Sequence, residues 1–198
     1  MTLLLLAGLA ACDRQSPPSG QAAANAGSPA PATSGEATGP SASGKGAFSY
    51  TVDRSKAGTP APDFTFRNPD GGDATLADFA GRPLLVNLWA TWCAPCVAEM
   101  PTLDAVAAAY GPKGLAVLTI SQDNQAEKAV APFFEKHKLP NLKGWTDAEN
   151  HFGFHYATSM LPTTVLYDAA GKETARVIGA MDWNGEEARK LIEEAMAS

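Results

Sequence analysis

The chain has 198 residues, 45% of them hydrophobic, and its 15 Lys and Arg against 21 Asp and Glu give a net charge of −6. It contains neither a basic cluster nor an apolar run of about 18 residues, which argues against a dedicated nucleic-acid-binding protein and against a transmembrane helix of ordinary length. Three cysteines occur, Cys12, Cys93 and Cys96, so one disulfide would leave one thiol to be explained.

The N-terminal eleven residues form a short apolar segment. Residues 3–11 begin with four leucines and end in small residues, and Cys12 follows. Residues 9–12, Leu-Ala-Ala-Cys, resemble the lipobox of bacterial lipoproteins, which implies that 1–11 is a signal segment and that Cys12 is acylated. Several acyl chains would anchor the protein stably. Because Asp13 follows, the resemblance implies a periplasmic protein held at the inner membrane.

The next segment has the composition of a tether. Of the 32 residues from 16 to 47, 26 are Ala, Gly, Ser or Pro, and none is aromatic or a large aliphatic. Such a stretch cannot bury enough apolar surface to offset the entropy of ordering the chain. We therefore expect residues 12–48 to be a lipidated, disordered linker and residues 49–198 to be one folded domain.

The domain is expected to open with a β-hairpin. Residues 60–67 alternate between apolar and polar side chains, and residues 68–72, Asn-Pro-Asp-Gly-Gly, are a strong turn signal. Residues 73–75 would form the returning strand. Residues 76–80 are typical of a short helical turn that ends at Gly81.

A buried strand and a long helix are predicted next. Residues 83–89 are almost continuously apolar, which is typical of a strand covered on both faces. The helix would begin near Cys93 and extend to Tyr110, with a kink at Pro101.

The remaining elements complete a mixed sheet. We expect strands at 115–121, 142–146, 163–168 and 173–178, and helices at 126–138, 147–156 and 186–196. The strand at 142–146 is expected at a sheet edge, and the last two strands form a hairpin. A βαβ unit followed by a hairpin and a helix predicts an α/β fold with helices on both faces of the sheet.

The motif Trp92-Cys93-Ala94-Pro95-Cys96 lies where the buried strand ends and the long helix begins. A helix N-terminus carries unpaired N–H groups and partial positive charge, which lower the pKa of a thiol there. Cys93 is therefore the expected nucleophile and Cys96 the recessed thiol that resolves a mixed disulfide. A zinc site would need further ligands, and a three-residue loop gives a structural disulfide little advantage. We expect a redox-active pair that uses no metal and no separate cofactor.

Around this motif the chain resembles the thioredoxin-like proteins, and among them the membrane-anchored thiol–disulfide oxidoreductases of the TlpA, ResA and CcmG (DsbE) type. The resemblance spans about residues 60–195. It is carried by residues 61–64 (Ala-Pro-Asp-Phe), 86–96, 99–101 and 161–164 (Leu-Pro-Thr-Thr), and by 179–183 (Gly-Ala-Met-Asp-Trp), which are closest to the TlpA branch. It implies a thioredoxin fold with an added N-terminal β-hairpin and a central insertion.

The resemblance assigns supporting roles to five residues. Pro162 matches the family's cis-proline. A cis bond is feasible there because an X–Pro bond adopts cis at a cost of about 0.5–1 kcal/mol. Its alternative is an ordinary trans proline. A cis-proline leaves the backbone of Leu161 free to pair with a substrate segment. Ala94 and Pro95 set the entry into the helix and tune the redox potential, and Trp92 shields the thiols.

A carboxylate is the candidate proton acceptor. Asn87 lies six residues before Cys93, where thioredoxins themselves carry a buried Asp that helps to deprotonate the recessed thiol. An amide cannot take that proton. Glu99, three residues after Cys96, matches the acidic residue of TlpA-type and ResA-type proteins, and burial would raise its pKa toward that task. The alternative is a solvated glutamate favoured by the helix dipole.

The leading functional hypothesis is a reductase of disulfides in periplasmic partner proteins. The resemblance implies electrons from a membrane thiol carrier of the DsbD or CcdA type. It implies as targets either copper-delivery proteins for cytochrome oxidase or apocytochrome c, with residues 179–183 favouring copper-site assembly.

Other functions stay open at this point. A copper-binding protein would combine Cys93 and Cys96 with a histidine. His151 and His155 are spaced to share a metal, but no third ligand is visible and exposed helix positions explain them better. A peroxidase is disfavoured, because the Pro-X-X-X-Thr-X-X-Cys motif of peroxiredoxins is missing. A disulfide isomerase is less favoured, since no dimerisation segment is visible.

Overall fold

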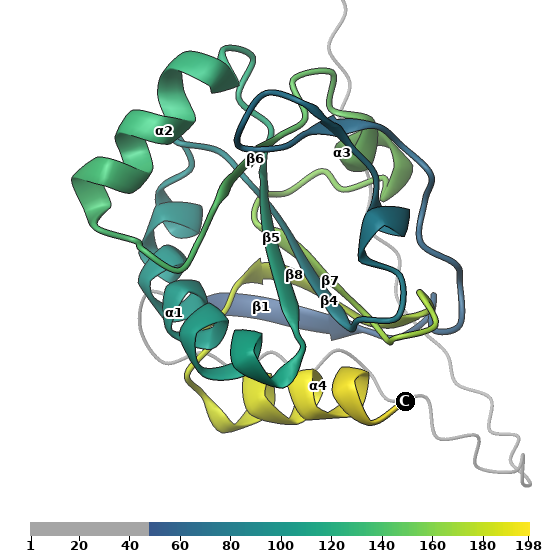
Figure 1. Ribbon diagram of the computed structural model, residues 1–198. Helices are drawn as coiled ribbons and strands as arrows, with labels where there is room; N and C mark the ends of the chain where they lie inside the picture. The colour runs from purple at the N-terminus through teal and green to yellow at the C-terminus, as the bar shows by residue number, and fades with distance from the viewer. Residues whose placement is uncertain (1–47) are drawn as a thin grey trace, which may run out of the picture. The chain divides into compact units, whose positions relative to one another are not determined.

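The computed structural model describes residues 48–198, which form a mixed eight-stranded sheet with helices on both faces (Figure 1). The predicted signal segment, Cys12 and the predicted tether lie outside the described residues. The strands are β1 (Ser49–Asp53), β2 (Phe66–Arg67), β3 (Asp73–Ala74), β4 (Leu84–Trp89), β5 (Ala116–Ser121), β6 (Gly144–Thr146), β7 (Thr163–Tyr167) and β8 (Glu173–Ala180). The helices are α1 (Ala94–Tyr110), α2 (Ala126–His137), α3 (His151–His155) and α4 (Glu186–Ala197). Within this part of the chain, no helix combines the length and the apolar character needed to cross a bilayer.

The sheet has the order β1-β8-β7-β4-β5-β6-β2-β3 and combines two units. In the first, β4 and β5 pair in parallel and α1 connects them. In the second, β7 and β8 form an antiparallel hairpin followed by α4. Antiparallel pairing of β4 with β7 joins the units, and α2, β6 and α3 lie between them in the chain. This is the thioredoxin-like fold that the sequence predicts, with the intervening elements where an insertion is expected.

Strand β4 lies at the centre of the core because every residue in it is buried. Its side chains alternate between the two faces of the sheet. Leu85 and Trp89 pack in a cluster with residues of α1, α2 and α4. Leu84, Val86 and Leu88 pack in a second cluster with residues of α3 and of the short 3-10 turn at Leu76–Phe79.

The sheet extends further at both edges than the sequence predicts. Strand β1, which the sequence analysis missed, pairs with β8 along its whole length. At the other side, Arg67 of β2 pairs with Thr146 of β6, so the prediction of an edge strand at 142–146 is wrong. Strand β2 also pairs with β3, so β3 takes the edge position and the hairpin covers β6.

The N-terminal hairpin is present but shorter than predicted. Residues 60–65 form no ladder apart from one bridge between Pro60 and Lys172, since prolines at 60 and 62 have no N–H to donate. The predicted turn does form: the Asn68 side-chain oxygen accepts hydrogen bonds from the backbone N–H groups of Asp70 and Gly72.

Helix α3 begins four residues later than predicted. Asn150 has a φ of 58° and a left-handed conformation, which a continuous right-handed helix cannot include. The Asp147 carboxylate accepts the backbone N–H of Phe152 at 3.0 Å and so satisfies a free donor of the first helical turn. The segment from 147 to 150 is therefore a capping turn.

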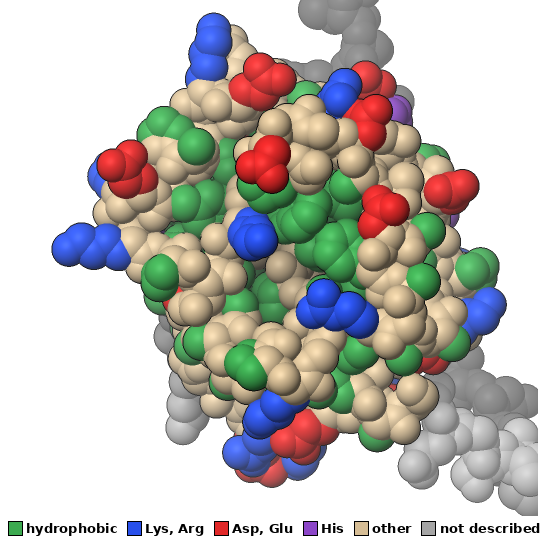
Figure 2. All heavy atoms as spheres, viewed as in Figure 1, with side chains coloured by type: hydrophobic (Ala, Val, Ile, Leu, Met, Phe, Trp, Pro, Cys, Tyr) green, Lys and Arg blue, Asp and Glu red, His purple; other side chains and the backbone are tan. Residues whose placement is uncertain are grey.

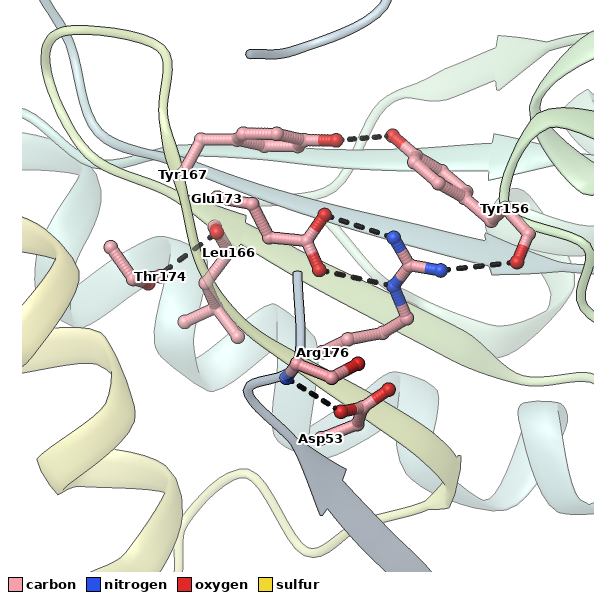
Figure 3. Close-up of polar contacts among 8 residues, drawn as sticks. Asp53, Tyr156, Leu166, Tyr167, Glu173, Thr174 and Arg176 are labelled. Carbon is pink, nitrogen blue, oxygen red and sulfur yellow. Dashed lines mark hydrogen bonds and ion pairs between the residues drawn. The ribbon is translucent and has the colours of Figure 1, made fainter. Parts of the chain in front are cut away.

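A buried polar cluster holds the chain where α3 ends (Figure 3). Two guanidinium nitrogens of Arg176 donate to the Glu173 carboxylate at 3.1 and 2.9 Å, and a third donates to the carbonyl oxygen of Tyr156 at 3.0 Å. The hydroxyl groups of Tyr156 and Tyr167 lie 2.6 Å apart. From this point the chain runs through residues 157–161 to the start of β7.

Candidate active site

Cys93 is the N-cap residue of α1, in an extended backbone conformation, and its sulfur accepts the backbone N–H of Cys96 at 3.3 Å. The two cysteines form a disulfide with their Cα atoms 5.3 Å apart. Cys93 retains 6% of its exposure, whereas Cys96 has none. Pro95 stands in the first helical turn, where its missing N–H costs nothing. This asymmetry makes Cys93 the sulfur that a partner can approach.

The loop before Cys93 is held by a residue that the sequence analysis missed. The buried carboxylate of Asp123 accepts the backbone N–H and the hydroxyl of Thr91, at 2.9 and 2.7 Å, and the hydroxyl of Ser121, at 2.7 Å. Thr91 follows β4 and Asp123 follows β5, and parallel neighbouring strands end at the same edge of the sheet. The sequence did offer one signal for these residues, since each is a polar residue that directly follows a buried strand.

Cys93 opens into a hollow of about 630 Å³. The described residues that line it are Trp92, Cys93, Ala94, Pro95, Gln122, Asn124, Asn150, Gly153, Thr158, Ser159, Met160 and Leu161, and none of them is charged. Trp92 and Met160 are 71% and 54% exposed at its rim. Trp92 therefore lies beside the thiols with most of its side chain in solvent, and its shielding role stays a prediction.

The peptide bond between Leu161 and Pro162 is cis, as the resemblance implies. Pro162 is buried, and its carbonyl oxygen accepts the backbone N–H of Gly179 at 2.9 Å. Leu161 is half-buried and lines the hollow. The fold thus brings residues some 70 positions apart in the chain, Cys93 and Leu161, to the lining of one hollow.

Glu99 is completely buried, which excludes the alternative of a solvated helix glutamate. Its Oε2 accepts the backbone N–H of Met181 at 3.0 Å and the indole N–H of Trp183 at 3.2 Å, and its Oε1 accepts the side-chain N–H of Asn87 at 2.8 Å. Burial raises the pKa of Glu99 to about 7, and the three donors limit that rise because they stabilise the carboxylate. The group lies one helical turn after Cys96.

Three partners of this carboxylate cluster were not assigned from sequence. Met181 and Trp183 belong to the block 179–183, which the resemblance singled out without indicating a role. Thr164 accepts a second N–H of Asn87 at 2.9 Å, because it lies directly opposite Asn87 in the β4–β7 ladder. The strand register that creates this contact is not readable from the sequence.

The histidine pair, His151 and His155, belongs to no cluster of three metal-ligating side chains among the described residues. Within residues 48–198, no three His, Cys, Asp or Glu side chains are placed to hold a metal ion together. The rings of His151 and His155 instead contact Phe64, with centroid separations of 5.7 and 5.3 Å. The copper-binding alternative therefore has no ligand set in the described residues.

A second hollow, of about 760 Å³, lies between α2 and the turn of the β2–β3 hairpin. Its lining includes the apolar side chains of Val130, Phe134 and Trp145. Figure 2 shows apolar side chains gathered in a hollow of this face of the molecule. Its lining includes neither a cysteine nor a histidine. The redox chemistry of the described chain therefore belongs to the Cys93 hollow.

The geometry supports one type of chemistry. A cysteine pair that closes and opens a disulfide accepts or releases two electrons and two protons. A helix N-terminus stabilises a thiolate at its N-cap position, which Cys93 occupies, and the buried carboxylate of Glu99 lies on the same helix, three residues after Cys96. The cis-proline side of the hollow offers a wall along which an extended polypeptide can lie.

Comparisons with known proteins agree with this geometry. The Redoxin family model matches residues 56–192. The chain is 30% identical over 132 residues to the thiol-disulfide oxidoreductase ResA of Bacillus cereus, covering 67% of this chain and 75% of ResA. It resembles the exposed lipoprotein thioredoxin of Streptococcus pneumoniae (27% identity, TM-score 0.55, 67% and 99% of the two chains). It also resembles a secreted disulfide oxidoreductase of Mycobacterium tuberculosis (26% identity, TM-score 0.55, 67% and 96%).

Proposed function

The chain belongs to the Redoxin family and is a thiol–disulfide oxidoreductase of the ResA and CcmG type, and from this premise we propose that it reduces disulfides of partner proteins outside the cytoplasm. The observation that carries the proposal is the asymmetric pair at the start of α1: Cys93 opens into an uncharged hollow and Cys96 is fully buried. The dithiol supplies both electrons, so the reaction needs no separate cofactor.

The proposed reaction has two steps. The Cys93 thiolate attacks one sulfur of the partner's disulfide, a mixed disulfide forms, and the partner's other sulfur leaves as a thiolate that takes a proton from solvent. Cys96 then loses its proton and attacks the Cys93 sulfur, which releases the partner's second sulfur as a thiolate that also takes a proton from solvent. The partner gains two electrons and two protons, and the Cys93–Cys96 pair is oxidised to the disulfide.

Glu99 is proposed as the base that takes the Cys96 proton in the second step. A pKa of about 7 suits a base at neutral pH, and general bases contribute roughly 10²–10⁴-fold to a rate. We expect Glu99→Gln to slow release of the mixed disulfide at least tenfold while leaving the first attack by Cys93 within twofold. Stopped-flow thiol exchange separates the two steps. The exposed Glu193→Gln variant is the matched control, and equal release rates in both variants would remove Glu99 from this role.

Partner segments are proposed to bind in extended form along Leu161 and Pro162. Support comes from the position of Leu161 in the lining of the same hollow as Cys93 and from the cis bond that follows it. Ala94, Pro95 and Trp92 also line this hollow. Main-chain pairing would give this contact affinity without strong sequence preference.

The location is proposed to be the periplasmic face of the inner membrane, with Cys12 as the lipid anchor. Its similarity to two proteins of known structure, an exposed lipoprotein and a secreted oxidoreductase, supports an extracytoplasmic role. Electrons would come from a membrane thiol carrier of the DsbD or CcdA type. Replacing Cys12 with Ala should move the protein from the membrane fraction to the soluble fraction, and unchanged fractionation would contradict the anchor.

Two partner classes follow from the sequence resemblance, copper-delivery proteins for cytochrome oxidase and apocytochrome c. Residues 179–183 favour the first. The reduced protein should be offered an oxidised copper chaperone and an oxidised Cys-X-X-Cys-His peptide in parallel. Faster reduction of the chaperone supports copper-site assembly, faster reduction of the peptide supports cytochrome c maturation, and inactivity on both removes this assignment.

The direction of electron flow is tested in cells. A reductase that is continually recharged should keep Cys93 and Cys96 mainly as thiols, which alkylation and gel mobility report directly. A mainly oxidised pair would contradict the reductase proposal. Copper retained in stoichiometric amount after purification, and lost in Cys93→Ser, would favour a copper carrier instead.

A further inference from the structure

The two oxygens of the Glu99 carboxylate have different surroundings. Oε2 receives two N–H groups, from the Met181 backbone and the Trp183 indole, and neither of these donors can become an acceptor. Among the described residues, Oε1 has Asn87 as its one hydrogen-bond partner. A proton added to Glu99 therefore fits best on Oε1, facing Asn87.

Asn87 has limited freedom of movement. Its backbone lies in β4, paired with Thr119 on one side and Thr164 on the other, and the residue is fully buried. One amide nitrogen donates to both Glu99 and Thr164, while the amide oxygen has no hydrogen-bond partner within residues 48–198. A buried acceptor without a partner costs free energy, so it calls for an explanation.

Rotation of the amide by half a turn exchanges its nitrogen and oxygen. With Glu99 ionised, the nitrogen suits both neighbours, since a carboxylate and a hydroxyl oxygen each accept. With Glu99 protonated on Oε1, the amide oxygen suits both neighbours, because the carboxylic acid and the Thr164 hydroxyl each have a hydrogen to donate. Each orientation makes two hydrogen bonds, and each leaves the other end of the amide unpaired.

We propose that Asn87 is a positioning residue whose amide turns over when Glu99 gains or loses its proton, so that both charge states of the carboxyl group keep their hydrogen bonds. An ionised aspartate at this position could only accept, and a leucine could neither accept nor donate. An amide is the side chain of this size that supports both states.

The environment of Glu99 leaves few other groups to respond to its charge. From its own helix the nearby titratable group is Cys96, and the contacts from β4 and from residues 181–183 are uncharged. Asp182, between the two donors, is exposed and accepts the backbone N–H of Asn184. The value of the Asn87 amide rotation for catalysis rests on the proposed function, in which Glu99 takes the Cys96 proton. The rotation itself does not depend on that function.

The test uses the full chain in its disulfide form, in which neither cysteine of the pair titrates. Nuclear magnetic resonance follows the Glu99 carboxyl carbon and the Asn87 side-chain amide through a pH titration. We expect both to titrate with one midpoint, and the nuclear Overhauser effect between the Asn87 NH₂ hydrogens and the Thr164 methyl group to weaken at least threefold below it. If the nuclear Overhauser effect between Asn87 and Thr164 stays unchanged through the titration, the proposal is overturned.

Variants give a second measurement. In Glu99→Gln the glutamine oxygen takes the donors of Met181 and Trp183, and its NH₂ group faces Asn87. The Asn87 amide should then stay in the turned orientation at every pH. Asn87→Asp should raise the Glu99 midpoint by more than one pH unit, while Thr119→Val, a buried strand neighbour outside the cluster, should leave it unmoved. Equal shifts of the Glu99 midpoint in Asn87→Asp and Thr119→Val would indicate a merely structural effect and overturn the proposal. Failure of Glu99 as a base is read separately, from the release rate of Glu99→Gln.

Discussion

Glu99 and Glu173 are buried to nearly the same extent, with 0% and 3% exposure, but their partners differ. Glu173 receives two guanidinium nitrogens of the partly buried Arg176, so a neighbouring positive charge balances its own. Glu99 receives only neutral N–H donors among the contacts described, and burial raises its pKa to about 7. The comparison teaches that burial alone does not make a carboxylate reactive: the absence of a cationic partner leaves its proton exchangeable near neutral pH.

The two carboxylates also lie in different parts of the core. Cys96 and Trp183, the neighbours of Glu99, belong to the cluster under α1 and α4, whereas Tyr156 and Tyr167 belong to the cluster on the other face of the sheet. The Glu173 cluster holds the chain that leads from α3 into the cis-proline loop. One cluster therefore takes part in the proposed chemistry, and the other supports the wall of the site.

The largest expected effect comes from breaking the paired cluster. Arg176→Met leaves the buried Glu173 carboxylate without its cation, and removal of one partner of a buried ion pair costs about 3–5 kcal/mol of unfolding free energy. Urea unfolding of the oxidised protein measures it. The double variant Glu173→Gln/Arg176→Met should recover much of the loss, because no unpaired charge remains. A loss below about 1 kcal/mol in the single variant would show that the pair is not needed.

An intermediate effect is expected from the unpaired carboxylate. The pKa of Glu99 is about 7 in the folded protein and about 4.5 in the unfolded chain. Between these values the unfolded chain ionises while the folded protein stays protonated, so the unfolding free energy falls as the pH rises and levels off above about 7. The fall is on the order of 3 kcal/mol.

Glu99→Gln should abolish this part of the pH profile, which chemical unfolding between pH 4 and 8 measures as a difference from the unmodified protein. Glu193→Gln on the exposed face of α4 is the matched control and should follow the unmodified protein. Parallel profiles for all three proteins would mean that Glu99 ionises in the fold as easily as in the unfolded chain.

The smallest effect is expected at an exposed ion pair. A guanidinium nitrogen of Arg54 lies 2.6 Å from a carboxylate oxygen of Glu194, and about half of each side chain is in solvent. Solvent screening limits such pairs to about 0.2–1 kcal/mol. Arg54→Ala should therefore change the urea midpoint several times less than Arg176→Met. If Arg54→Ala shifted the urea midpoint as much as Arg176→Met does, burial would not explain why the Glu173–Arg176 pair matters more to stability.

Much of the active site was predictable because its signals are local. Cys93 and Cys96 are recognised by their spacing at a strand-to-helix junction. Glu99 and Pro162 were recognised by resemblance. The contacts of Asn87 with Thr164 and of Glu99 with Trp183 were not predictable, because they join residues about 80 positions apart. Asp123 was missed because nothing near it in the chain shows that it faces Thr91.

The sequence by itself determined the order of the main elements, since the apolar run of β4 and the turn residues at 68–72 are read over a few neighbouring positions. It also determined the redox pair. Only the tertiary structure decided where β1 and β6 lie in the sheet, because strand neighbours are chosen by backbone pairing that leaves little trace in composition. Only the fold decided that Glu99 is buried beside neutral donors while Glu173 is buried beside a cation. That difference depends on which side chains meet across the sheet, and it separates the carboxylate proposed to move a proton from the one that holds the structure.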